Sequence, residues 1–200
     1  MLEYGWRLIM ATLEIELKNL LTADQFRQIK QQFEFAKAFT QTNYYFDTPD
    51  QQLYQQHCGL RIRIFNDYAE QTLKVSTAQA TANQHELLEI TDRLPQDLAT
   101  NQQLLKTGEV AAALAQRQIS LAQLKVFAAA TTTRQIATLN VGKLTLDQTN
   151  YPNGHQDYEL ELETNTPREA QEFFVELLQQ HQIFRAPVIN KVARAAQNQL

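Results

Sequence analysis

The chain has 200 residues, 44% of them hydrophobic and 20% charged, so it is long enough to form one globular domain with a substantial core. Its formal net charge of −4 gives no electrostatic basis for binding nucleic acid or an anionic membrane surface. A single cysteine, Cys58, excludes an internal disulfide and argues against a thiolate zinc site.

The N-terminal segment MLEYGWRLIM is too short and too poor in small residues for a signal peptide. No apolar run approaches the roughly 18 residues that cross a bilayer. We therefore expect a cytoplasmic protein without a membrane partner. Residues 1–11 are expected to be an N-terminal extension, and residues 12–200 a single domain.

The first predicted strand, TLEIELKNLL at residues 12–21, alternates apolar and charged side chains one for one. Its charged face carries Glu14, Glu16 and Lys18. Thr22 follows as a helix N-cap, and the apolar spacing beyond it predicts an amphipathic helix to about residue 39.

Four further strands are predicted before residue 95, at 41–47, 60–65, 69–76 and 85–91. The second and third are separated only by a turn at Asn66-Asp67, which favours an antiparallel hairpin. The charged faces of these strands carry Arg61, Arg63, Lys74 and Glu89.

The remaining chain is predicted to contain a helical region, three strands and two helices. Residues 96–117 are rich in Ala, Leu and Gln and predict helix; residues 125–141, 143–149 and 156–164 predict strands; residues 166–181 and 190–197 predict helices. The charged faces of the strands at 143–149 and 156–164 carry Lys143, Asp147, Glu159, Glu161 and Glu163. Seven or eight strands joined by tight turns indicate an α+β protein with an antiparallel sheet.

Acidic and basic residues are largely segregated onto different strands, whereas a solvated sheet surface would carry scattered charges. Like charges at positions i and i+2 lie on one face and repel, which destabilises the sheet unless an opposite charge lies between them. Carboxylates suit Mg²⁺ or Mn²⁺, and arginine and lysine suit phosphoryl oxygens. A closed barrel would turn all these faces inward and leave the apolar faces to be covered by helices.

The residues EIELK at 14–18 match the Glu-x-Glu-x-Lys signature of the CYTH superfamily, the triphosphate tunnel metalloenzymes. The chain resembles in particular small Firmicutes CYTH proteins described as adenylate cyclase-like or thiamine triphosphatase-like. The likeness continues in family order through NYYFDTPD (43–50), LRIR (60–63), TLK (72–74), LLE (87–89), TTR (132–134), LDQTNY (146–151), YELELE (158–163) and NKVAR (190–194).

This resemblance implies an eight-stranded antiparallel β-barrel with flanking helices, which binds a small-molecule triphosphate together with Mg²⁺ or Mn²⁺. It implies metal ligands at Glu14, Glu16, Glu159 and Glu161. It implies a triphosphate cradle at Lys18, Arg61, Arg63, Lys74, Arg134 and Lys191, with Lys143 as a further basic residue. Lys18, Glu89 and Asp147 are implied as catalytic residues, the two acids by holding a second metal or orienting water.

The function expected from this set is metal-dependent hydrolysis of inorganic triphosphate or of a small organic triphosphate such as thiamine triphosphate. A class IV-type adenylate cyclase and a non-catalytic polyphosphate- or nucleotide-binding module are the alternatives. A calycin-like barrel is disfavoured because its interior should be apolar. Arg194 either lines the tunnel or caps the last helix, and the flanking helices could support a homodimer.

Overall fold

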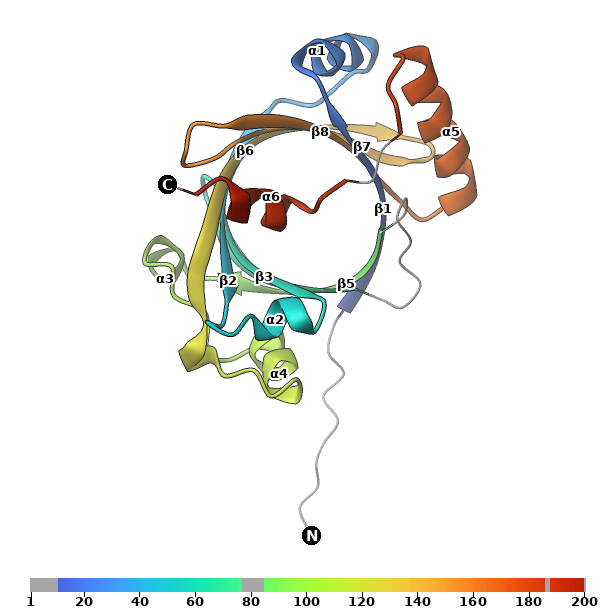
Figure 1. Cartoon of the computed structure of the whole chain (residues 1–200). Coiled ribbons are helices and arrows are strands. Elements are labelled where there is room, and N and C mark those ends of the chain that lie inside the picture. The colour runs from blue at the N-terminus through green and yellow to red at the C-terminus, as the bar shows by residue number, and fades with distance from the viewer. Residues whose placement is uncertain (1–10, 77–84, 186–187, 200) are drawn as a thin grey trace.

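Eight antiparallel strands form a closed barrel in a computed structural model that describes residues 11–76, 85–185 and 188–199 (Figure 1). The order around the barrel is β1-β5-β4-β3-β2-β6-β7-β8. The side chains of Ala11, Thr12, Glu14, His85 and Glu86 lie outside this description. The predicted eight-stranded antiparallel barrel is therefore confirmed. The predicted extension falls mainly on residues 1–10, outside the described residues, and stays a prediction.

The strands are β1 (Ala11–Leu21), β2 (Phe39–Asp47), β3 (Cys58–Ile64), β4 (Ala69–Ser76), β5 (His85–Leu94), β6 (Lys125–Leu139), β7 (Gly142–Asn150) and β8 (Gln156–Thr164). The helices are α1 (Ala23–Gln32), α2 (Gln52–Gln55), α3 (Gln96–Thr100), α4 (Glu109–Gln116), α5 (Pro167–Gln180) and α6 (Lys191–Gln197). None of the described helices is both long enough and apolar enough to cross a membrane.

Two helical regions differ from the sequence-based expectation. The helix after β1 ends at Gln32, because the backbone N–H of Ala36 donates to the carbonyl of Ile136 on β6, at 2.9 Å. The region 96–117 contains two helices instead of one. The carboxylate of Asp92 on β5 caps the second helix by accepting from the N–H groups of Glu109 and Val110, both at 2.9 Å.

The apolar faces of the strands point outward and are covered by helices. Leu17, Leu146 and Leu162 are at most 1% exposed and lie in one core with residues of α1 and α5. A second core joins β3, β4 and β5 to α3 and α4. The hydrophobic stabilisation therefore lies between the barrel wall and its helices, which leaves the barrel interior to polar side chains.

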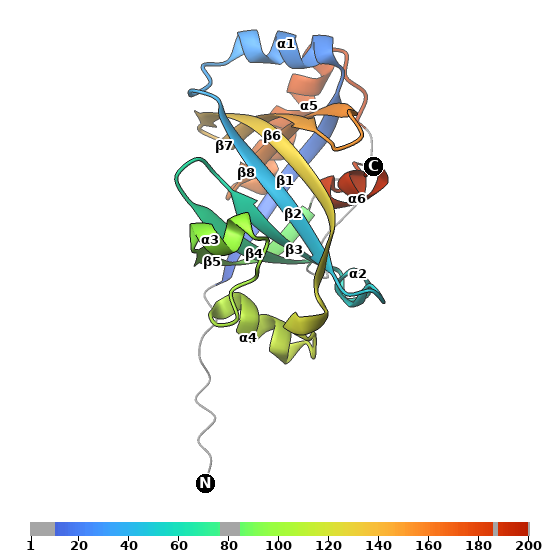
Figure 2. The ribbon, with the colours of Figure 1, turned by 90° about the vertical axis from the view of Figure 1, so that its left-hand side faces the viewer.

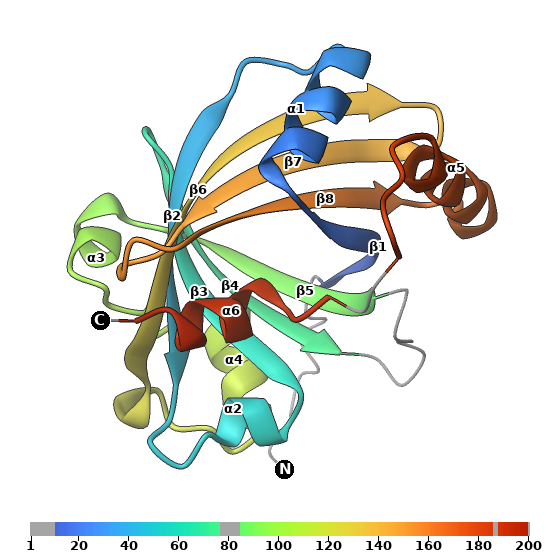
Figure 3. The same cartoon turned by 45° about the horizontal axis from the view of Figure 1, so that its top comes forward.

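Helix α6 differs from the other helices in its position. Figure 3 shows it across one opening of the barrel, whereas α1 and α5 lie against the outside. Its residue Ala195 is buried in a small core with Tyr45 on β2, Ala128 and Ala130 on β6, and Tyr151. This packing brings the end of the described chain to the tunnel.

The homodimer stays a prediction. Leu13 and Leu88 are cross-strand partners on β1 and β5 and are 50% and 38% exposed. Nothing among the described residues identifies what would cover them.

Candidate functional site

The charged residues of the strands face the barrel interior because of the one-for-one alternation. On β1, Glu16 and Lys18 are 6% and 8% exposed, and the intervening Leu17 packs in the outer core. On β8, Glu159 and Glu161 alternate in the same way with the outward Leu160 and Leu162. The strand period therefore collects the charges of distant segments inside one tunnel.

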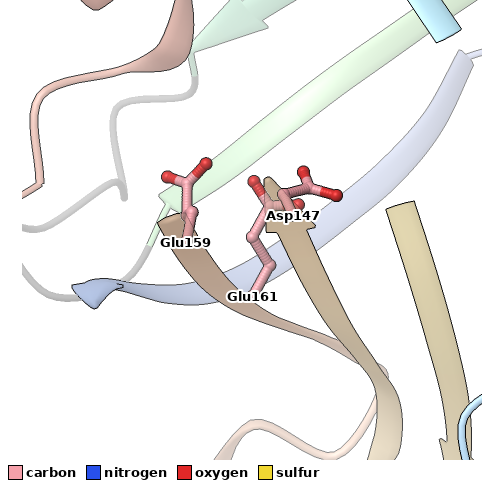
Figure 4. A group of neighbouring side chains, drawn as sticks. All are labelled: Asp147, Glu159 and Glu161. Atoms are coloured by element: carbon pink, nitrogen blue, oxygen red, sulfur yellow. The ribbon is translucent and has the colours of Figure 1, made fainter. Parts of the chain in front are cut away.

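Three carboxylates from the β7–β8 hairpin lie together in this tunnel (Figure 4). Asp147, Glu159 and Glu161 each offer a carboxylate oxygen, and these oxygens all lie within 4.8 Å of one another. The antiparallel register explains the grouping, because Asp147 is the cross-strand partner of Glu159. We call these three residues the carboxylate triad.

Arg134 and Lys191 neutralise the carboxylate triad. Arg134 on β6 donates to Asp147 at 2.8 and 2.5 Å and to Glu161 at 2.8 Å. Lys191 on α6 lies 2.5 Å from Asp147, 2.9 Å from Glu159 and 3.5 Å from Glu161. Arg134 and Lys191 therefore lie in one cluster with the three carboxylates, and their binding of a triphosphate stays a prediction.

The charges of these partners decide the protonation of the triad. Burial raises the pKa values of Asp147 and Glu161, but Arg134 and Lys191 outweigh it and hold both pKa values below their usual range. Burial lowers the pKa of Lys191, and the three carboxylates outweigh it and raise that pKa. At neutral pH the carboxyl groups of Asp147 and Glu161 are therefore ionised, as carboxylate ligation of a metal requires.

A second group of charges lies on β3, β4 and β5. Glu89 is 3.3 Å from Arg61 and 3.4 Å from Lys74, its cross-strand partner. Burial raises the pKa of Glu89, but Lys74 and Arg61 outweigh it and lower that pKa overall. The Nε atom of Arg61 is buried and has no hydrogen-bond partner among the described residues. This donor is available to an anion in the tunnel.

Arg63 is only weakly compensated by acidic neighbours. Its Nε donates to Asn43 Oδ1 at 3.0 Å, and Glu70 lies 3.7 Å away. Burial, together with the charges of Arg61 and Arg134, lowers the pKa of Arg63 to about 9. The positive charge of Arg63 is therefore disfavoured until an anion approaches it.

Of the two predicted metal ligands on β1, the structure describes the side chain of Glu16 but not that of Glu14. Glu16 accepts from Lys18 at 2.5 Å and does not belong to the triad, although the charge of Glu161 acts on it. Burial raises the pKa of Glu16, but Lys18 and Lys74 outweigh it and lower that pKa. The side chain of Glu14 lies outside the described residues, so its predicted role is untested.

Lys143 lies apart from the other predicted cradle residues. Its side chain is 59% exposed and is 3.6 Å from Glu163, which is 46% exposed. This pair is at the start of β7 and the end of β8, so the structure places it at a tunnel end and not in the buried cluster.

Arg194 on α6 occupies the position that the sequence leaves undecided. It is 6% exposed, donates to both oxygens of Glu159 at 3.2 and 3.0 Å, and contacts Asp157 at 2.7 Å. Its NH1 also donates to the carbonyl of Ile189 at 2.5 Å. Arg194 therefore holds α6 against β8, a role that a helical pattern by itself does not reveal.

The donor chemistry of the triad suits a hard divalent cation. Its donors are all carboxylate oxygens, which suit the hard cations Mg²⁺ and Mn²⁺ better than metals that prefer sulfur or imidazole. All three side chains come from the paired strands β7 and β8. The residues therefore fit the metal that the family resemblance implies.

The comparison with known proteins agrees with this architecture. A model of the CYTH domain matches residues 12–196. The chain belongs to the CYTH domain family. A Bacillus subtilis relative, the candidate triphosphatase YjbK, is 34% identical over 184 residues, which cover 91% of this chain and 93% of the relative.

Two solved CYTH-like structures have the same fold. A candidate adenylate cyclase of Bacillus halodurans superimposes with a TM-score of 0.81 and 32% identity, covering 92% of this chain and 97% of the other. A candidate adenylyl cyclase of Hippeastrum, whose dominant activity is that of a triphosphatase, superimposes with a TM-score of 0.78 and 20% identity, covering 94% and 97%. The predicted family is therefore confirmed.

Proposed function

We propose that this CYTH protein hydrolyses a triphosphate compound inside its tunnel, with Mg²⁺ or Mn²⁺ as the cofactor. The observation that carries the proposal is the carboxylate triad facing a set of buried cations in one closed barrel. A polyphosphate needs both halves of this arrangement, because carboxylates hold the metal and cations offset the remaining phosphate charge.

The proposed metal ligands are Asp147, Glu159 and Glu161. Glu16 and Glu14 remain proposed additional ligands from β1. When bound, the metal would polarise a phosphoryl oxygen or lower the pKa of an attacking water. The position of Asp147 beside both glutamates of β8 supports its inclusion among the proposed ligands.

The proposed cradle consists of Lys18, Arg61, Arg63, Lys74, Arg134 and Lys191. Among the described residues the buried Nε of Arg61 has no hydrogen-bond partner, and the charge of Arg63 is poorly compensated, so both gain most from a bound anion. Glu89 is proposed to orient Arg61 and Lys74 through the two ion pairs it makes. Binding thus positions the triphosphate for in-line attack by water, which needs mainly alignment and charge neutralisation.

The relatives support the reaction class without naming a substrate. YjbK is described as a triphosphatase, and the Hippeastrum protein has triphosphatase activity despite its description as a cyclase. Hydrolysis is therefore proposed ahead of cyclisation.

The test is phosphate release from inorganic triphosphate, ATP and thiamine triphosphate, with Mg²⁺, with Mn²⁺ and with EDTA. Wild type is expected to turn over at least one compound with metal and none with EDTA. Glu161→Gln is expected to lower turnover by at least about 100-fold, because it removes a charged ligand from the triad. Glu163→Gln is the matched control on the same strand, since Glu163 is 46% exposed and lies outside the triad.

Two results would contradict the proposal. Turnover that persists in EDTA would contradict the proposed metal dependence. Equal effects of Glu161→Gln and Glu163→Gln would contradict the proposed role of the triad as the metal site. Formation of cyclic AMP and pyrophosphate from ATP, without release of phosphate, would establish the cyclase instead.

A further inference from the structure

Arg63 differs from the other proposed cradle cations in the partner that holds it. The nearest acceptor to its guanidinium among the described residues is the amide oxygen of Asn43, to which its Nε donates at 3.0 Å. Its acidic neighbour, Glu70, is 3.7 Å away. Each of the other cradle cations has a carboxylate oxygen at 3.4 Å or less; the pairs are Lys18–Glu16, Arg61–Glu89, Lys74–Glu89, Arg134–Asp147 and Lys191–Asp147.

The sheet fixes Asn43 beside Arg63. Figure 2 shows β2 between β6 and β3 in the barrel wall, and Asn43 on β2 is the direct cross-strand partner of Arg63 on β3. Direct partners in an antiparallel pair point to the same face, so the amide and the guanidinium share the tunnel face. Asn43 is 1% exposed. The contact therefore depends on the register of two paired strands and not on a loop.

The hydrogen bond from Arg63 to Asn43 orients the guanidinium. A guanidinium has donors only, so the amide must present its oxygen to it. The bond holds the Nε edge, and among the described residues neither Nη atom of Arg63 donates a hydrogen bond, although Nη1 makes the distant ion pair with Glu70. The Nη groups are thus left for the planar, two-point contact that arginine makes with phosphoryl oxygens.

A neutral partner is the poorer choice for the stability of the fold. Burial and the charges of Arg61 and Arg134 lower the pKa of Arg63 to about 9. Aspartate has almost the same shape as asparagine and would offset this buried charge, whereas an amide does not. Stability would therefore favour aspartate at position 43, and the amide makes sense where the charge of Arg63 is needed for a ligand.

We propose that Asn43 is a positioning residue, which orients Arg63 toward the phosphate chain and leaves its positive charge uncompensated for that chain. This inference rests on the proposed function, and it adds a neutral residue to a site otherwise made of charged ones. Asn43 acts through Arg63, so its effect on binding should disappear when Arg63 is replaced.

The first test is the variant Asn43→Asp. Calorimetry at one Mg²⁺ concentration measures the affinity for inorganic triphosphate, and thermal unfolding without ligand measures stability. The new carboxylate is expected to pair with Arg63, which should raise the unfolding temperature and lower the affinity at least about tenfold. Asn150→Asp is the matched control, since Asn150 lies at the exposed end of β7, and it should change neither quantity.

The second test is a double-mutant cycle between Asn43→Ala and Arg63→Gln. In the wild-type background, Asn43→Ala is expected to weaken triphosphate binding by about three- to tenfold, as for loss of one orienting hydrogen bond. In the Arg63→Gln background the same change should weaken binding by less than about twofold, because the group that Asn43 orients is absent. A side chain that serves packing alone would give the same loss in both backgrounds.

The remaining outcomes separate this inference from the proposed function. If wild type binds triphosphate and Asn43→Asp binds it equally well, the role of Asn43 is wrong and the cradle stands. Loss of both stability and affinity in Asn43→Asp, or equal losses in the two arms of the cycle, would likewise overturn the inference alone. If wild type binds no triphosphate with or without Mg²⁺, the cradle and the role of Asn43 fail together.

Discussion

The positive charge of Arg63 is costly in the ligand-free protein. Arg63 is buried near Arg61 and Arg134, and these surroundings lower its pKa to about 9. A bound polyanion removes this cost, so part of the binding free energy comes from relief of repulsion that is already present in the fold.

Substitution Arg63→Gln is therefore expected to separate stability from binding. The free energy of unfolding without ligand should stay within about 1 kcal/mol of wild type or rise, because a repelled buried charge is removed. The affinity for inorganic triphosphate should fall about tenfold, as for loss of a charge-assisted hydrogen bond. Thermal unfolding and calorimetry measure the two effects. Arg168→Gln on α5, where the side chain is 88% exposed, should change neither, and a large loss of stability in Arg63→Gln would contradict the argument.

Glu89 should make the stability of the protein depend on pH. Lys74 and Arg61 hold the pKa of Glu89 below its ordinary value of 4.5 in the folded state. Its contribution to stability is thus fully present above pH 4.5 and is lost as the pH falls through the lower folded value.

The variant Glu89→Gln is expected to be about 1–2 kcal/mol less stable than wild type at pH 7, since two cations lose their partner. The difference should be smaller at pH 3 than at pH 7, because acid favours the protonated glutamate, which has no charge to offer the two cations. Urea unfolding at both pH values measures it. A gap of the same size at both pH values would show that packing, not charge, explains the loss.

At the scale of the element, α6 depends on one arginine for its position. Arg194 binds Glu159 and Asp157 of β8, and Lys191, one turn earlier, reaches the carboxylate triad. The two side chains share Glu159, so a change at Arg194 should be felt by Lys191 and by the ligands of the metal.

Arg194→Gln is expected to speed amide hydrogen exchange in residues 191–197 and to weaken inorganic triphosphate binding about tenfold through Lys191. Arg194→Lys keeps a charge near Glu159, so its exchange rate and its affinity should lie between those of Arg194→Gln and wild type. Exchange measured by mass spectrometry reports the helix, and calorimetry reports the affinity. Weaker binding without faster exchange would mean that Arg194 contacts the ligand itself and does not act by positioning α6.

Sequence pattern predicts strands better than it predicts which side chains meet. The alternation that exposes Glu159 and Glu161 on one face is local and visible in the sequence. Their grouping with Asp147 depends on the register of the β7–β8 hairpin, and the position of Arg194 depends on how a separate helix docks. Neither follows from spacing along the chain.

The aromatic contacts at the β3–β4 turn do not follow from the sequence for a related reason. Phe65 and Tyr68 flank a turn, where the strand period no longer applies, and two strands and a helix separate Phe39 from its neighbour Phe65. Residues at the ends of elements therefore escape a method that depends on periodicity.

At the scale of the whole molecule, hydrophobic packing outside the barrel stabilises the fold, whereas Arg61, Arg63 and Arg134 repel one another inside the tunnel. Binding of a polyanion should raise the unfolding temperature, because the ligand binds the folded state alone. Inorganic triphosphate with Mg²⁺, at about 100 times its dissociation constant, is expected to add about 2.7 kcal/mol to the free energy of unfolding. Scanning calorimetry measures the shift; the same concentration of monophosphate is the control, and an equal shift with it would contradict a site built for a chain of phosphates.

The pairing of β1 with both β5 and β8 has a consequence for the order of folding. Ile15 pairs with Thr164, so the first strand to be synthesised cannot complete its hydrogen bonds until the last strand exists. Arg61, Arg63 and Lys74 lie on the local β3–β4 hairpin and can be positioned early, whereas the triad lies on β7 and β8, the last strands to be synthesised. During synthesis most of the part of the site that attracts an anion should therefore exist before the triad that attracts a cation.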